Sequence, residues 1–122
     1  MSRIREFSVN GDQIMFINRF RNTRNGFAHD TEFVYNGFLL VETTCHYINR
    51  TWENYAYQSV MLKAVSIAME TCKERCKRNF KALNGYNKMT AKRNEEFEKL
   101  LSTSEEYKKF IQIRDIIRGR VW

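Results

Sequence analysis

The 122-residue chain contains no proline, only five glycines, three cysteines and two histidines. With no proline and little glycine, no flexible linker is visible, and this length predicts a single domain. No apolar run approaches the ~20 residues of a membrane span, and the first residues lack the apolar core of a signal peptide. Three cysteines fit reduced thiols. We therefore expect a cytoplasmic protein without a membrane segment.

Signatures of catalysis are equally scarce. Cys45 and His46 are neighbours on a predicted strand, where adjacent side chains point to opposite faces, so they do not form a nucleophilic pair. Cys72 and Cys76 share a helix face, but a zinc site needs about four ligands, and two small core residues are the simpler interpretation. No glycine-rich phosphate loop is present. The sequence predicts no enzyme, no catalytic residue, no metal and no cofactor.

Charge of one sign dominates, because 21 lysines and arginines face 14 acidic residues and the net charge is +7. Such a balance favours an anionic partner, whether nucleic acid, a nucleotide or an acidic protein surface. The basic run 73–81 can contact phosphates, although runs of this kind are usually solvated helix faces. Nothing in it marks a helix that reads base edges.

The range 52–83 lacks proline and glycine and repeats apolar or small residues every four positions, which predicts one long helix. These residues are Trp52, Ala56, Val60, Ala64, Ala68, Cys72, Cys76 and Phe80. Thr51 is placed to cap its start, and Asn84–Gly85 to end it. Such a helix is roughly 45 Å long, whereas a compact chain of this length has a radius of gyration of about 14 Å. The helix should therefore project from its subunit or cross it entirely.

Apolar residues between positions 60 and 69 face several directions, since Lys63 and Ser66 are the only polar residues there. This pattern predicts burial on more than one side. The N-terminal segment can cover one side, and a second copy of the helix the other, with Ala64 and Ala68 permitting close approach. The alternative is a central helix wrapped by its own domain. We expect a homo-oligomer, at least a dimer, through this helix.

Residues 1–48 show the pattern of β structure. Three Asn-Gly pairs predict type I′ hairpin turns, because both residues tolerate positive φ. They stand at positions 10–11, 25–26 and 36–37. Strand-like runs lie between them, at 4–9, 13–20, 27–35 and 38–48. In the second run Ile14, Phe16, Asn18 and Phe20 should share one face.

The C-terminal part predicts two shorter helices. Thr90 is placed to cap a helix over 91–101, and Ser102 with Glu105 forms a capping-box pattern for another that ends near Arg118. The expected fold class is α+β: an N-terminal antiparallel β-meander of about four strands packed on one long central helix, followed by two shorter helices. We expect one domain over 1–122, with the sheet at 1–48, the oligomerisation helix at 51–84 and the two C-terminal helices at 90–118.

Arginines stand beside aromatic residues in two places that suit an anionic ligand. Arg24 precedes Phe27 near the second turn, and Arg50 lies beside Trp52 and Tyr55 before the long helix. A guanidinium can bind phosphate while an aromatic ring stacks on a base. The alternative, that these aromatic rings attach the helix to the sheet, stays open at this point.

Three stretches resemble a known protein family. They are RNTRNGFAH at 21–29, YINRTWENYAYQSVM at 47–61 and NGYNKMTAKR at 84–93. With the plan of a sheet followed by a long helix, they are similar to the first-described family of phage Thoeris anti-defence proteins, which act as signal sponges. The resemblance implies that the chain binds glycocyclic ADP-ribose, made by a TIR-domain enzyme, and does not degrade it. It also implies oligomers built from dimers, the cytosol of a host bacterium and, in some members, a separate site for cyclic oligonucleotides.

A ligand of the ADP-ribose type needs cations for its pyrophosphate, a ring for adenine and polar groups for its ribose hydroxyls. The candidate cations are Arg24, Arg50, Lys92, Arg93, Arg114 and Arg118. The candidate rings are Phe27, Trp52, Tyr55 and Tyr86, and the candidate polar groups are Asn25, Asn87 and Thr90. We expect a pocket between subunits, closed by the last helix of one chain. Nucleic acid is not the expected partner. The alternative function is a basic dimeric adaptor that binds nucleic acid or inhibits a host nucleoprotein.

Overall fold

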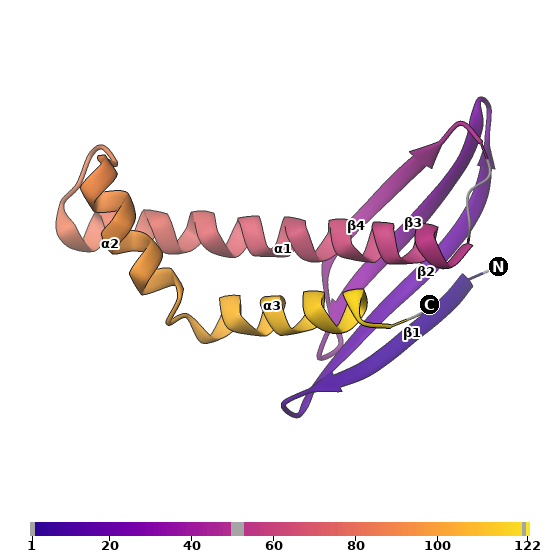
Figure 1. Cartoon of the computed structure of the whole chain (residues 1–122), viewed down its shortest axis with the longest axis horizontal. Helices are drawn as coiled ribbons and strands as arrows, with labels where there is room; N and C mark the ends of the chain where they lie inside the picture. The colour runs from indigo at the N-terminus through magenta and orange to yellow at the C-terminus, as the bar shows by residue number, and fades with distance from the viewer. Residues whose placement is uncertain (1, 50–52, 121) are drawn as a thin grey trace.

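The computed structural model describes residues 2–49, 53–120 and 122, which form a four-stranded sheet followed by three helices (Figure 1). The strands are β1 (Ser2–Val9), β2 (Asp12–Thr23), β3 (Gly26–Tyr35) and β4 (Phe38–Tyr47). The helices are α1 (Glu53–Asn84), α2 (Ala91–Leu101) and α3 (Glu105–Arg118). The strands pair antiparallel in the order β1-β2-β3-β4, which confirms the predicted α+β meander. Within the described ranges, no helix is long and apolar enough to cross a membrane.

Two of the three predicted hairpin turns have the expected form. Asn10 and Gly11 have φ values of 50° and 85°, and Asn36 and Gly37 have 47° and 83°. Both central residues of each loop therefore adopt positive φ, as a type I′ turn requires. The first turn fixes the register of β1 on β2, whereas the register that the other turn sets for β3 on β4 shifts by one residue between Phe33 and Val34.

The prediction of a type I′ turn at Asn25–Gly26 is wrong. Thr23 pairs with Gly26, so the two-residue loop is Arg24–Asn25, and neither of these residues has positive φ. Glycine is required at position 26 for another reason: a Cβ there would lie 2.1 Å from the carbonyl oxygen of Tyr47. The start of β3 thus approaches the end of β4 too closely for a side chain.

One face of the sheet carries the core, because α1 packs over β3 and β4 while α3 returns beside α1 towards β1 (Figure 1). The predicted face of β2 is correct: Ile14, Phe16 and Asn18 are buried, and Phe20 is half-buried. The core side chains of β3 meet those of α3, where the Phe33 and Phe110 rings pack edge to face with 6.2 Å between their centroids. This packing holds α1 and α3 side by side.

Ala64 and Ala68 are buried in the core of their own subunit. The predicted close approach of a second helix at these two residues is therefore wrong, because the sheet and α3 already cover this face. The solvent-facing side of the same stretch carries Lys63, Ser66 and Ile67 instead. An oligomer built through α1 has to use this other side.

The second half of α1 projects beyond the sheet and forms, with α2, an arm (Figure 1). A small separate cluster of buried side chains, Phe80, Phe97 and Leu101, joins the two helices. The helix ends at Asn84, where Gly85 has a φ of 66°, as the sequence predicted. The projection follows from length, because 32 residues in a helix span about 48 Å.

The predicted cap of α2 is correct, and the predicted cap of α3 is wrong. The Thr90 hydroxyl oxygen accepts a hydrogen bond from the Arg93 backbone N–H, as expected. The Ser102–Glu105 capping box is wrong: Ser104 caps α3 by accepting from the Tyr107 backbone N–H. Ser102 still belongs to the end of α2, and its hydroxyl donates to the carbonyl of Lys99 at 2.6 Å. Thr51, the predicted cap of α1, lies outside the described residues.

Candidate functional site

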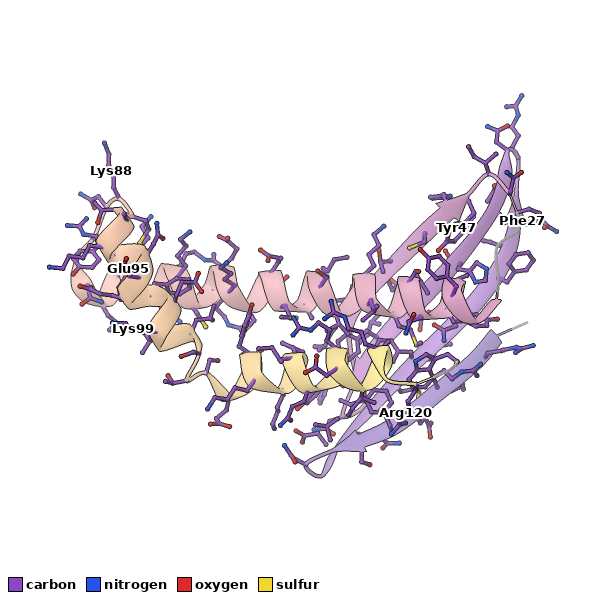
Figure 2. The ribbon with its side chains drawn as sticks, viewed as in Figure 1. Phe27, Tyr47, Lys88, Glu95, Lys99 and Arg120 are labelled. Atoms are coloured by element: carbon purple, nitrogen blue, oxygen red, sulfur yellow. The ribbon has the colours of Figure 1, made fainter. Side chains whose placement is uncertain are left out.

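The candidate ligand residues of this chain lie in three separate places rather than one. Arg24, Asn25, Phe27 and Tyr55 lie at the sheet end of the molecule, by the β2–β3 turn and the start of α1. Tyr86, Asn87, Thr90, Lys92 and Arg93 lie at the end of the arm, and Arg114 and Arg118 lie on α3. Figure 2 shows Phe27 and Tyr47 at one end of the molecule and Lys88 at the other. Arg50 and Trp52 lie outside the described residues.

At the sheet end, Arg24 and Asn25 line a shallow pocket of about 340 Å³. Its other walls are Thr23, His46, Tyr47 and Ile48. Phe27 is half-buried and stacks on Phe20 with 5.6 Å between ring centroids, so one face of the candidate ring is already covered. Burial raises the pKa of Tyr47, so its hydroxyl stays neutral and can donate a hydrogen bond. Tyr55 is 59% exposed.

At the end of the arm, the candidate residues are engaged with one another. The Arg93 guanidinium lies 3.9 Å from the centroid of the Tyr86 ring and donates to the carbonyl of Lys88 at 2.8 Å. The Thr90 hydroxyl oxygen is used as the α2 cap. Asn87 and Lys92 are exposed. The ring and the hydroxyl expected to bind adenine and ribose therefore already have structural contacts within the chain.

The third place is a groove between α1 and α3, of about 490 Å³. Arg114 and Arg118 are four residues apart on α3, so their side chains leave the helix on the same face. Across the groove, α1 contributes Ser59, Leu62, Lys63, Ser66, Met69 and Glu70. The groove is thus lined by three cationic side chains, two serine hydroxyls and one carboxylate.

The position of the groove walls follows from two contacts. Gln58 of α1 donates from Nε2 to the carbonyl of Ile117 at 3.2 Å, which holds the end of α3 against α1. Lys63 donates from Nζ to the carbonyl of Thr44 at 2.6 Å, so its side chain lines the groove while its ammonium is held towards β4. Arg118 forms no ion pair among the described residues, and Arg114 has only its neighbour Asp115, at 3.4 Å.

Sequence reasoning missed Lys63, Ser59 and Ser66 as groove residues. The signal was present, since Lys63 and Ser66 are the only polar residues between positions 60 and 69. These residues could be assigned to a groove only once α3 was known to lie beside α1.

The two thiols of α1 behave as core residues in this structure. Cys72 is buried and Cys76 half-buried, and burial raises the pKa of Cys72 to about 11. A thiol with so high a pKa is protonated near neutral pH and is a poor nucleophile. Over residues 2–49, 53–120 and 122, no three histidine, cysteine or acidic side chains come together as a metal site.

Comparison of the chain with protein-family models, with curated proteins and with solved structures found no match.

Proposed function

We propose that this protein binds and sequesters a nucleotide of the cyclic ADP-ribose type, glycocyclic ADP-ribose, without cleaving it, so that a phage evades Thoeris defence. The observation that carries the proposal is the groove between α1 and α3. Its volume of about 490 Å³ lies within the range of ligand pockets, and Lys63, Arg114 and Arg118 line it. The identity of the signal and the defence context rest on the resemblance of three sequence stretches.

The chemistry of the groove suits a pyrophosphate with attached riboses. Arg114 and Arg118 can each present a planar pair of N–H donors to phosphate oxygens. Lys63 can add a point charge once its ammonium turns from the Thr44 carbonyl to the ligand, and the Ser59 and Ser66 hydroxyls can pair with ribose hydroxyls. These groups bind charge and hydroxyls, and the proposal assigns no residue to bond cleavage.

A base-stacking ring is missing from the groove wall as described, whose residues are aliphatic, polar or charged. None of the described candidate rings lines the groove: Phe27 lies at the sheet end, Tyr86 follows the end of α1, and Tyr55 lies one helical turn before the groove residue Ser59. We therefore propose that the binding unit is a homo-oligomer, at least a dimer, in which a second copy brings a ring to the groove. The exposed side of α1 beside Ser66 is the surface available for that copy.

Isothermal titration calorimetry with purified glycocyclic ADP-ribose tests this assignment. Losing one charge-assisted contact costs roughly 1.5–3 kcal/mol, so R114Q and R118Q should each bind about 10- to 150-fold more weakly. K108Q is the matched control, because Lys108 is an exposed cation on the same helix and does not line the groove. If K108Q weakened binding as much as R118Q, or if R114Q and R118Q bound normally, the groove would not be the site.

A further inference from the structure

The net charge of the molecule is concentrated in one short segment. Residues 76–94 contain six basic residues and no acidic residue: Lys77, Arg78, Lys81, Lys88, Lys92 and Arg93. The rest of the chain holds fifteen basic and fourteen acidic residues, a net charge of only +1. We call residues 76–94 the cationic tip.

The fold places the cationic tip at the end of the arm, and the nearest acidic residues in the sequence are Glu74 before it and Glu95 and Glu96 after it. The segment spans the last turns of α1, the connection and the first turn of α2, and Figure 1 shows it at the end of the arm, away from the sheet. None of its cations forms an ion pair with a described carboxylate, whereas Lys73 and Arg75 just before it pair with Glu98 and Glu106. The ion pairs of the arm stop where the tip begins.

Some of these charges oppose helix stability, although Lys81 in the last turn of α1 has the sign that the helix dipole favours there. The first turn of α2 contains Lys92 and Arg93 and no acidic residue, although the positive end of a helix dipole favours acidic ones. Helix α3 of the same chain follows the usual rule, with Glu105 and Glu106 in its first turn. Lys77 and Lys81 are like charges four residues apart on α1, which is also unfavourable. Violations of this kind are expected where a partner supplies the opposite charge.

We propose that the cationic tip binds the phosphodiester backbone of a nucleic acid strand, independently of its base sequence. Lysine and arginine side chains that form no ion pair within the chain can pair with phosphates and displace their counterions. Base reading is not part of the proposal, because the Tyr86 ring is covered on one face by Arg93 and touched by Phe80 at a centroid distance of 5.7 Å. This surface is separate from the α1–α3 groove and does not depend on the nucleotide proposed to bind there.

Fluorescence anisotropy with a short labelled oligothymidine, recorded at salt concentrations from about 50 to 200 mM, tests the proposal. The tip variant is K77Q/K81Q/K88Q, and the control is R19Q/K99Q/K108Q, whose three positions lie outside the tip and which has the same net charge. Each phosphate contact contributes a salt slope of about 0.7 on single strands, so the tip variant should reduce the slope by about 2. We also expect its binding to weaken at least about tenfold at low salt, while the control changes little.

Circular dichroism of all three proteins shows whether each of them is folded. If either variant unfolds, the comparison is made between the single substitutions K88Q and K108Q, and K88Q should change the slope by about 0.7. Equal losses in the tip variant and in the control would overturn the assignment, since binding would then follow net charge alone. Absence of binding by the unchanged protein at low salt would overturn it too. So would displacement of the oligothymidine by poly-glutamate at equal charge concentration, which would identify an acidic protein as the partner.

Discussion

The carboxylate of Asp12 accepts a hydrogen bond from the Lys109 ammonium, and the two residues are 97 positions apart. The contact joins the β1–β2 turn to α3. Tyr35 donates to the same carboxylate oxygen at 2.5 Å, and Asn36 donates to the other oxygen at 3.0 Å. The bonds from Lys109, Tyr35 and Asn36 hold the pKa of Asp12 well below its usual range. They therefore help to place α3, and with it the wall of the groove.

The substitution D12N should lower stability at neutral pH and remove part of its pH dependence. The folded-state pKa of Asp12 lies below its unfolded value of about 4, so its charge stabilises the fold above that pH. This contribution is lost as pH falls below about 4, so the unchanged protein and D12N should then have similar free energies of unfolding. Urea unfolding at pH values from 7 to 3 measures both free energies. A difference between them that stayed constant or grew on acidification would contradict the account.

The substitution G26A should destabilise the protein more than G11A does. Alanine at position 26 would place its Cβ 2.1 Å from the Tyr47 carbonyl oxygen, so β3 and β4 have to separate at that end. At position 11 the added Cβ meets nothing within 4 Å, and only the positive φ is strained, at roughly 1–2 kcal/mol. Thermal unfolding of both variants gives the comparison. Equal midpoints would mean that the close approach at Gly26 does not exist in solution.

The two serines before α3 provide a matched pair. S104A should cost about 1 kcal/mol, because it removes the side chain that caps α3. S102A removes only a bond to the Lys99 carbonyl at an exposed position and should stay within about 0.5 kcal/mol of the unchanged protein. Chemical denaturation resolves this difference. A larger loss of stability in S102A than in S104A would support the Ser102–Glu105 capping box that the sequence pattern predicted.

The arm should unfold locally when its own small core is removed. F97A deletes the buried ring that joins α2 to Phe80 of α1, a change that typically costs 3–5 kcal/mol in a core. Few other contacts hold the arm, so we expect hydrogen exchange to accelerate in α2 and the last turns of α1, with protection of the sheet retained. F110A, in the main core, is the control and should accelerate exchange in the sheet as well. Uniform acceleration in F97A would mean that the arm and the sheet unfold as one unit.

Local patterns in the sequence were sufficient for most of the fold. The alternation through Ile14 and Phe16 predicted the buried face of β2, the spacing of four predicted α1, and the Asn84–Gly85 pair predicted where α1 ends. The failures are tertiary in origin. Gly26 resembles a turn glycine in the sequence, but glycine is needed there because the Tyr47 carbonyl lies so close. Ala64 is buried within its own subunit because the sheet and α3 cover its face of α1, and this packing exists only once the chain has folded back.

The candidate site was less predictable than the fold, for the same reason. Arg114 and Arg118 were identified from chemistry alone, whereas their neighbours across the groove, Lys63 and Ser66, depend on the pairing of α1 with α3. The remaining candidates that the structure describes lie at both ends of the chain, and bringing them together with the groove is a property of the proposed oligomer. A single sequence carries little information on that arrangement.

Native mass spectrometry of the purified protein, before and after mixing with the nucleotide products of an active TIR enzyme, tests the central proposal most directly. We expect an oligomer, at least a dimer, that gains the mass of the intact cyclic nucleotide and releases it unchanged on heating. Recovery of cleaved fragments would show an enzyme instead of a sponge. No gain in mass would contradict sequestration altogether.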